Sequence, residues 1–284
     1  MLVNLDMVLK KAQEGKYAVG LFNTHDTDML EAAICAAEEA KSPIIIGTAE
    51  VLLPYGPLPL ISPALVAAAR RASVPVVVHY DHGLTFEKTM EALKLGFTSV
   101  MFDASAKPWD ENVAETREVV KVAHAFGATV EGEIGHVGSA ADGDDRNGMY
   151  TTVDEATRFQ SGTGVDALAV AVGTAHGVYK ARPQLQFDRI AEIRAAMDTP
   201  IVLHGGSGLS DDDFRRAISL GVAKLNIHTD MVLAGMRAMR EQCEAHDPAK
   251  PATWDYLDVR KAKVEAIKTV VRRKLELFGS VGKA

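Results

Sequence analysis

The chain has 284 residues, 47% of them hydrophobic, so it can bury a large core, and its composition does not indicate disorder. Its net charge of −7, from 31 basic and 38 acidic residues, argues against nucleic-acid binding but does not exclude a small anionic substrate. No segment resembles a signal peptide or a membrane span, so we expect a cytoplasmic protein that does not bind membranes. The two scattered cysteines, Cys35 and Cys243, are expected to be reduced thiols in or near the core.

Short apolar runs rich in β-branched residues recur along the chain, and each is followed by a stretch with helical periodicity. Nearly unbroken runs of this kind are typical of strands buried on both faces in a parallel sheet. Successive runs start about one strand-loop-helix unit apart. Eight strands are predicted in this way: Ala18–Phe22, Pro43–Gly47, Pro75–Tyr80, Thr98–Asp103, Thr129–Ile134, Ala167–Val172, Pro200–His204 and Ala223–Ile227.

The predicted helices are Asp28–Lys41, Pro63–Ser73, Phe86–Leu95, Asp110–Phe126, Asp154–Thr163, Phe187–Met197, Asp211–Leu220 and Met231–Glu244. Several are followed by a glycine suited to a C-terminal cap, such as Gly96 and Gly221. Eight such units predict an α/β fold, a closed (β/α)8 TIM barrel in one domain over residues 1–284, with an open doubly wound sheet as the alternative. The basic, amphipathic stretch Asp255–Phe278 is predicted to form an extra terminal helix outside the eight units.

Three of the apolar runs lead into a histidine: His82, His176 and His204. The exit ends of parallel barrel strands converge, and a catalytic zinc site commonly has three protein ligands and an open position. These histidines therefore predict a metal site, whereas the alternative for each is an ordinary core or surface histidine. His79 is three residues before His82 on extended chain, so we expect it to face the other way and to pack in the barrel wall.

Asp81 directly precedes one of these histidines. A carboxylate beside a metal-bound substrate oxygen can move a proton while the ion holds the developing negative charge. The alternative is that Asp81 only orients a ligand imidazole.

Two segments after the seventh and eighth strands are suited to an anion. Gly205 to Gly208 precede a helix that starts near Ser210, and Asn226 to Thr229 lead into the next helix. Backbone N–H groups at helix starts bind phosphate, and barrel phosphate sites often use these two loops. Lys180 is a further candidate that adds positive charge.

The connection Gly135–Tyr150 is glycine-rich, charged in its second half, and long for a compact barrel. It is either a mobile lid over the barrel rim or a solvated surface loop.

These motifs closely resemble those of the class II, zinc-dependent ketose-bisphosphate aldolases, the family of fructose- and tagatose-bisphosphate aldolases. The similar segments run nearly from end to end: Tyr17–Asn23, Asp81–Gly83, Phe102–Ser105, Glu131–Gly135, Gly173–Gly177, His204–Gly208, Asn226–Thr229 and Phe278–Ala284. The resemblance implies a lyase of carbohydrate metabolism, a homodimer or homotetramer, that reversibly cleaves a phosphorylated ketose to dihydroxyacetone phosphate and an aldehyde through a zinc-stabilised enediolate.

The resemblance also implies roles for individual residues. Zinc would be held by His82, His176 and His204, with Glu133 as an alternative or supporting ligand, and Asp81 would carry the proton of the C4 hydroxyl. A monovalent cation, Na⁺ or K⁺, would lie near the phosphate. The substrate-binding set would be Asn23, Gly177, Lys180, Gly205, Gly206, Ser207, Asn226, Ile227, His228, Thr229 and Arg260, the last from a segment where relatives carry an arginine that reaches a distal phosphate.

The sequence departs from the family pattern at three places. The family's mobile loop reads Gly-Gly-x-Glu-Asp, and here Ala141 stands at the position of the glutamate that handles the donor carbon's proton. Either Asp142, Asp144 or Asp145 takes its place, or the activity is weak or altered. The usual Ser-His after the fourth strand is Ser105 and Ala106, and His228 replaces the common aspartate, alanine or asparagine. These changes favour a related ketose phosphate, or a substrate with a different second charged group, over the glycolytic fructose bisphosphate.

Three alternatives remain at this point. A Schiff-base aldolase would need a lysine that faces into the barrel, and Lys224 is the candidate. A zinc hydrolase of this fold usually carries a His-x-His pair at the first strand, whereas this chain has only His25 after it. A metal- and phosphate-binding homologue that has lost turnover is the non-enzyme alternative suggested by Ala141.

Overall fold

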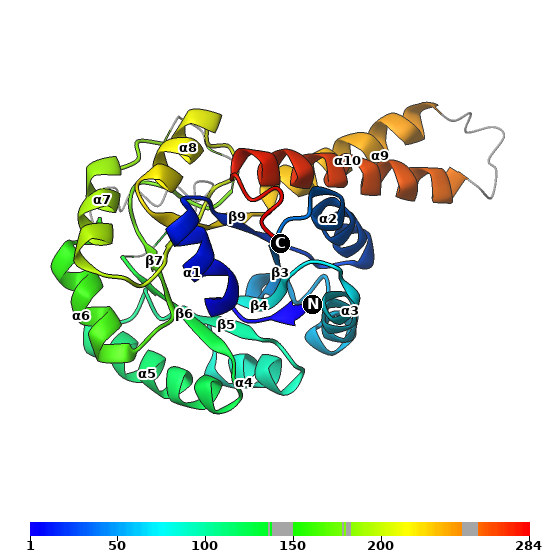
Figure 1. Ribbon diagram of the computed structural model, residues 1–284. Coiled ribbons are helices and arrows are strands. Elements are labelled where there is room, and N and C mark those ends of the chain that lie inside the picture. The colour runs from blue at the N-terminus through cyan, green and yellow to red at the C-terminus, as the bar shows by residue number, and fades with distance from the viewer. Residues whose placement is uncertain (136, 138–149, 178, 180–182, 246–254) are drawn as a thin grey trace.

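Eight parallel strands form a closed barrel in the computed structural model, which describes residues 1–135, 137, 150–177, 179, 183–245 and 255–284 (Figure 1). Around the ring the order is β4-β3-β2-β9-β8-β7-β6-β5, and pairing of β4 with β5 closes it. The predicted TIM barrel is therefore confirmed, and the open sheet is excluded. The strands are β2 (Val19–Asn23), β3 (Ile44–Ala49), β4 (Val76–Gly83), β5 (Ser99–Phe102), β6 (Thr129–Ile134), β7 (Ala167–Val170), β8 (Ile201–Leu203) and β9 (Val222–Ile227).

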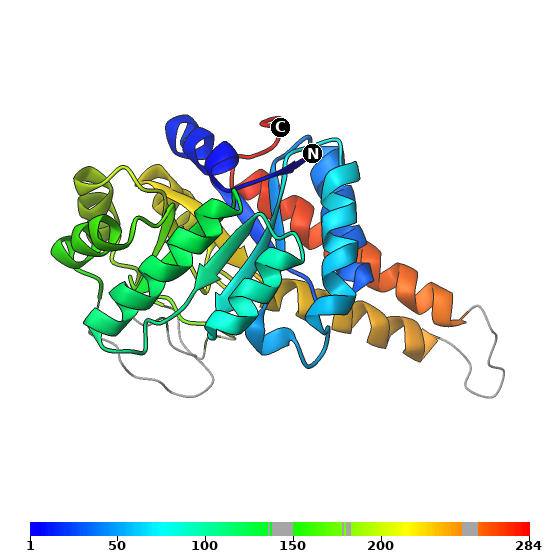
Figure 2. The ribbon, with the colours of Figure 1, turned by 90° about the horizontal axis from the view of Figure 1, so that it is seen from below.

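Helices surround this ring, and each strand of the barrel is followed by one (Figures 1 and 2). They are α2 (Thr27–Ala40), α3 (Leu58–Arg71), α4 (Phe86–Lys94), α5 (Trp109–Ala125), α6 (Val153–Thr163), α7 (Phe187–Ala196), α8 (Asp211–Ser219) and α9 (Thr229–Ala245), followed by α10 (Asp255–Leu277). No helix among the described residues is both long enough and apolar enough to cross a bilayer.

The strands are apolar on both faces near their starts, which explains their unbroken hydrophobic runs. On β4, Val76 and Val78 pack outward into the large cluster between sheet and helices, whereas Val77 belongs to a second cluster inside the barrel. The inner cluster also contains Leu5 and Leu9 of α1 (Asp6–Gly15), which lies across the N-terminal mouth (Figure 2). That mouth is closed by apolar packing, so polar chemistry is confined to the opposite rim.

Three elements were not predicted from the sequence. The two-residue strand β1 (Leu2–Val3) pairs with β4, α1 plugs the barrel, and a 3-10 turn, η1 (Glu50–Leu52), follows β3. Helix α3 starts at Leu58 rather than at Pro63, because Pro59 already lies in its first turn, where the missing N–H costs nothing.

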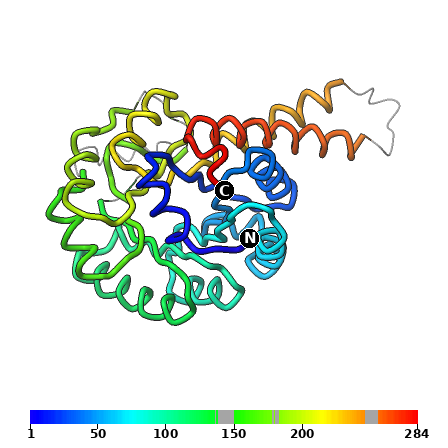
Figure 3. Tube along the Cα trace, viewed as in Figure 1, coloured from blue at the N-terminus to red at the C-terminus, as the bar shows by residue number. Residues whose placement is uncertain are grey.

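Helices α9 and α10 pack against each other and extend beyond the barrel as a long arm (Figure 3). The expectation that Cys243 lies in or near the core is wrong, because this residue is exposed near the end of α9 on the arm. Cys35, on α2, is partly buried as expected, and neither cysteine forms a disulfide.

Candidate functional site

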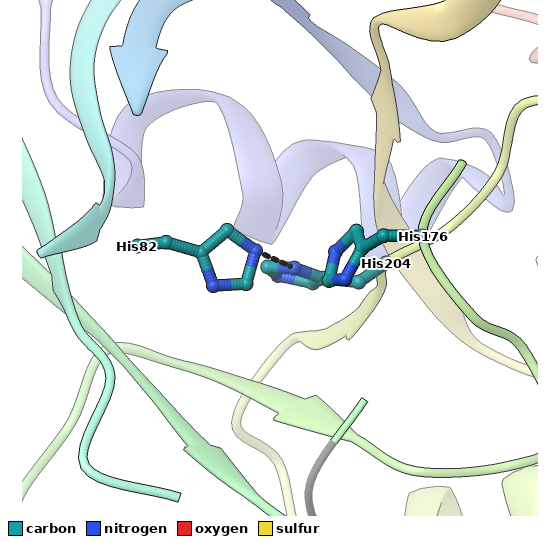
Figure 4. Close-up of side chains that lie close together, drawn as sticks. All are labelled: His82, His176 and His204. Atoms are coloured by element: carbon teal, nitrogen blue, oxygen red, sulfur yellow. Dashed lines mark hydrogen bonds between the residues drawn. The ribbon is translucent and has the colours of Figure 1, made fainter. Parts of the chain in front are cut away.

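His82, His176 and His204 converge at the C-terminal rim of the barrel (Figure 4). His82 lies near the end of β4, His204 directly follows β8, and His176 lies in the loop after β7, six residues beyond its last residue. One ring nitrogen from each lies within 4.8 Å of those of the other two, and Nε2 of His82 is 2.8 Å from Nδ1 of His204. Three imidazoles from distant parts of the chain are thus close enough to share one ion.

A local reversal of the backbone brings His82 into this group. Strand alternation would place Asp81 and His82 on opposite faces of the sheet. His82 has a φ of 44°, in the left-handed region that non-glycine residues rarely adopt, and the β4–β5 register shifts between Tyr80 and Gly83. Both Asp81 and His82 therefore line the same cavity.

Carboxylates behind two of the rings determine which nitrogens face the centre. Nδ1 of His82 lies 2.8 Å from Oδ2 of Asp103, and Nε2 of His204 lies 2.8 Å from Oε1 of Glu131. A carboxylate accepts the proton on the ring nitrogen that it contacts, so the other nitrogen of each ring is oriented inward.

The buried side-chain atoms without a hydrogen-bond partner among the described residues include Nε2 of His176 and Oε2 of Glu133. Buried atoms of this kind are normally paired, and a bound cation would satisfy both. A second group of possible ligands joins His82 and Glu133 with Asp103. The donor set of imidazoles and carboxylate fits a divalent ion of the zinc type.

The three imidazoles are too close together for all to carry charge. Burial alone would lower the pKa of His82, but Asp81 and Asp103 raise it to about 10. Burial and then the charge of His82 lower the pKa of His176 to about 3, and the same two causes lower that of His204. Burial raises the pKa of Glu133 to about 8. The site therefore presents neutral imidazole nitrogens beside one imidazolium.

Asp81 is held as a carboxylate in the same cavity. Burial favours its neutral form, but the charge of His82 and a contact with His79 keep its pKa well below the usual range. The amide groups of Asn23 and Asn226 donate to its two oxygens at 2.6 and 3.1 Å. Asp81 is thus an oriented anion at the centre of the rim.

A charged layer lies directly below these groups inside the barrel. Nζ of Lys224 is 2.8 Å from Oε2 of Glu131, and both side chains are fully buried. The contact is mainly ionic, because Oε2 accepts no hydrogen bond of good geometry. His79 is buried as expected, but it faces the barrel interior, with Nδ1 2.7 Å from Oγ of Ser99. Lys224 does not line the cavity, which argues against the Schiff-base alternative.

A cavity of about 520 Å³ opens above this layer. Part of its wall is the predicted anion site: Gly177, Gly205, Gly206, Ser207, Asn226, Ile227, His228 and Thr229. Oγ of Ser207 accepts from the backbone N–H groups of His228 and Asp230 at 3.3 and 3.4 Å, which joins the two loops where α9 starts. At Gly205, with φ of 64°, a Cβ would collide with the carbonyl oxygen of Ala175. Helix-start N–H groups at such a wall suit a phosphate.

Arg260 is not brought to this site. It lies on α10, where its guanidinium pairs with Asp28 at 2.8 Å and Glu31 at 2.6 Å, and it does not line the cavity. Lys180, Ala141, Asp142, Asp144, Asp145 and most of the connection 135–150 lie outside the described residues.

Several lining residues were missed as site residues by sequence reasoning: Ala49, Val51, Leu52, Leu84, Asp103 and Val137. Asp103 directly follows β5 and was detectable from the same strand-end rule that picked out the histidines. The others are apolar, and their sequence context does not distinguish them from core residues.

Comparisons with known proteins agree with this geometry. Residues 3–283 match the family model described as fructose-bisphosphate aldolase class-II. The chain is 40% identical to a fructose-bisphosphate aldolase from Thermus caldophilus, with all of both chains covered. It is also 40% identical to a 6-phospho-5-dehydro-2-deoxy-D-gluconate aldolase from Shouchella clausii, covering 98% of this chain and 94% of that one.

Among solved structures, the YdjI aldolase from Escherichia coli K12 is similar over the full length of both chains, with 39% identity and a TM-score of 0.89. The match to the family model and the full-length relatives together show the family. This chain belongs to the class-II fructose-bisphosphate aldolases, and the protein is a lyase of the aldolase class.

Proposed function

We propose that this protein is a metal-dependent aldolase that reversibly cleaves a phosphorylated ketose to dihydroxyacetone phosphate and an aldehyde. The observation that carries the proposal is the convergence of His82, His176 and His204, with an unpartnered nitrogen on His176, beside the carboxylate of Asp81. The family is generally metal-dependent and acts on phosphorylated sugars, in keeping with this donor set.

The three histidines would hold a zinc ion, with Glu133 as a supporting ligand. When bound, the ion supplies Lewis acidity that stabilises negative charge on the donor half of the substrate. Oε2 of Glu133 is buried without a hydrogen bond, which supports its place near the ion.

Asp81 is the proposed proton carrier. During cleavage its carboxylate takes the proton of the C4 hydroxyl as the bond between C3 and C4 breaks, so that the C4 oxygen becomes the aldehyde carbonyl. The electron pair of the broken bond remains on C3 of the donor half, which takes up a proton to become dihydroxyacetone phosphate. In condensation it returns this proton. Asn23 and Asn226 hold both carboxylate oxygens, which keeps the group oriented through the cycle.

The phosphate of the donor half is proposed to bind at the glycine loops and the start of α9. Gly177, Gly205, Gly206 and the backbone around His228 and Thr229 form this wall. Lys180 and a monovalent cation, Na⁺ or K⁺, are proposed to assist on the ground of the family resemblance.

We also propose a cytoplasmic homodimer or homotetramer. The arm of α9 and α10 exposes large apolar side chains, which favours an interface between copies of this chain. They are Leu233, Met236, Tyr256 and Leu257. Light scattering coupled to size-exclusion chromatography measures the oligomeric state, and a monomer would contradict this part of the proposal.

Turnover of a panel of ketose phosphates, with metal content measured on the same preparation, tests the proposed reaction. Cleavage should be lost on chelation, restored by zinc, and lost in His176→Ala. The matched control is His124→Ala, which removes an exposed histidine that pairs with Asp166 outside the cavity. Full turnover in His176→Ala would refute the proposal. Binding of dihydroxyacetone phosphate without hydrogen exchange at its hydroxymethyl carbon would instead favour the non-catalytic homologue suggested by Ala141.

A further inference from the structure

The cavity has a second wall, away from the proposed phosphate site. It is formed by Asn23 at the end of β2, Ala49 at the end of β3, Val51 and Leu52 of η1, and Leu84 after β4; we call it the β2–β3 wall. In the ring of eight strands, β3 lies four strands from β7, so this wall stands opposite the loop that carries Gly177. Asp81 and His82, on β4, are next to β3 in the ring. With the donor half at the glycine loops, the β2–β3 wall is the part of the cavity opposite it that is available to the aldehyde half.

The charges near this wall are already paired. Arg260 of α10 contacts Asp28 at 2.8 Å and Glu31 at 2.6 Å. Lys263, one turn further along, contacts Asp26 at 2.6 Å and Asp28 at 3.3 Å. Two cations thus face three carboxylates, so this cluster is net negative. Among the described residues that line the cavity, none is a lysine or an arginine.

Two imidazoles stand between this wall and the proposed phosphate site, because His25 follows β2 and His228 follows β9, its neighbour in the ring. His228 lines the cavity and packs edge-on against His25, with ring centroids 5.8 Å apart. Nε2 of His228 and Nδ1 of His25 have no hydrogen-bond partner among the described residues. Burial and then the neighbouring His25 lower the pKa of His228 to about 4, and burial lowers that of His25, so both rings are neutral near pH 7. A neutral imidazole offers one donor and one acceptor, which matches a hydroxyl group.

On the basis of the aldolase function proposed above, we propose that the aldehyde half of the substrate is an uncharged, hydroxyl-bearing chain. It lies against Val51, Leu52 and Leu84, and His228, supported by His25, hydrogen-bonds to one of its hydroxyl groups. A phosphate at its far end would meet apolar side chains, which do not offset the loss of its hydration.

The condensation reaction tests this specificity directly. With dihydroxyacetone phosphate as donor, kcat/KM is measured for glyceraldehyde, for glyceraldehyde 3-phosphate and for an aldehyde that carries a carboxylate. We expect at least a tenfold preference for the uncharged aldehyde. A preference for either anionic aldehyde overturns the inference.

Hydrogen exchange at the hydroxymethyl carbon of dihydroxyacetone phosphate, followed by NMR in D₂O without aldehyde, separates the two proposals. Exchange together with a preference for an anionic aldehyde overturns only the specificity inference. Absence of exchange and of condensation overturns the aldolase proposal, and the inference that rests on it.

Variants of the wall give a second readout. Val51 is exposed, so Val51→Arg should fold. It should raise kcat/KM for glyceraldehyde 3-phosphate about tenfold. The control Val51→Gln, which adds a polar group without charge, should not. His228→Ala and His25→Ala should reduce condensation with glyceraldehyde more than they reduce hydrogen exchange. Equal reductions in the two rates, or an unchanged phosphate preference in Val51→Arg, would contradict the assignment of this wall.

Discussion

Removal of the cation inside the barrel should destabilise the fold strongly. In Lys224→Met the side chain keeps its length, but Glu131 loses the ammonium group that lies 2.8 Å from its Oε2. Burial alone would raise the pKa of Glu131, and it is Lys224 first and then His204 that lower this pKa to about 2. The variant therefore leaves a fully buried carboxylate without its main counter-charge.

The size of the effect follows from the geometry. At 2.8 Å and an effective dielectric constant of about 20, the attraction between the two charges is about 6 kcal/mol. Desolvation of both groups offsets part of it, and breaking a buried pair on one side costs about 3–5 kcal/mol. For a chain of this size, a loss of that order lowers the melting temperature by on the order of 10 °C.

Thermal unfolding followed by far-UV circular dichroism measures this loss. The double variant Lys224→Met/Glu131→Gln removes both charges while an amide oxygen remains available to His204, so it should recover most of the lost stability. If Lys224→Met has the same melting temperature as the unmodified chain, or if the double variant is no more stable than the single one, the charged layer is not organised as described.

Three further predictions concern the metal, the proton carrier and the scaffold. The pKa values of His82 and Glu133 are raised to about 10 and about 8, so zinc binding displaces at least one proton throughout pH 6–9. Zinc affinity measured by chelator competition should therefore rise at least about tenfold per pH unit, and a flat profile would contradict this. Asp81→Asn should lower kcat for cleavage by about 10²–10⁴-fold while the variant still folds, as judged by far-UV circular dichroism, and near-normal turnover would exclude it as proton carrier. Thr152→Ala breaks the capping box that joins Thr152 to Glu155 at the start of α6. It should lower the free energy of unfolding, measured by denaturant titration, by about 1 kcal/mol while activity is retained. An unchanged free energy of unfolding would mean that the cap does not stabilise the fold.

The barrel was predictable because its strands are buried on both faces. Runs such as Val76–Val78 are apolar at every position, so they can be identified as buried strands without knowing which face points into the barrel. The turn residues added further signals: Gly96 and Gly221 follow α4 and α8 with positive φ, as their predicted capping positions require. Helix α1 was missed because its plugging role depends on contacts with the far ends of strands distant in sequence.

The candidate site was predictable in its members but not in their orientation. His176 and His204 were found because each follows a buried strand, and the exit ends of parallel barrel strands converge. Strand alternation alone would have turned His82 away from Asp81, and only the left-handed backbone at His82 reveals why it does not. Arg260 was placed by analogy, and its pairing with Asp28 and Glu31 depends on the packing of α10 against α2, which residue spacing does not encode.

The backbone reversal at His82 has a mechanical consequence. The group proposed to move the proton and one of the groups proposed to hold the cation belong to consecutive residues, Asp81 and His82, whose Cα atoms are about 3.8 Å apart across one peptide unit. Covalent geometry, rather than the motion of loops or helices, sets the spacing of these two Cα atoms. Thermal motion that opens the rim to admit or release a sugar leaves this Cα spacing unchanged, so the two groups can separate only through rotation about the torsions of these two residues.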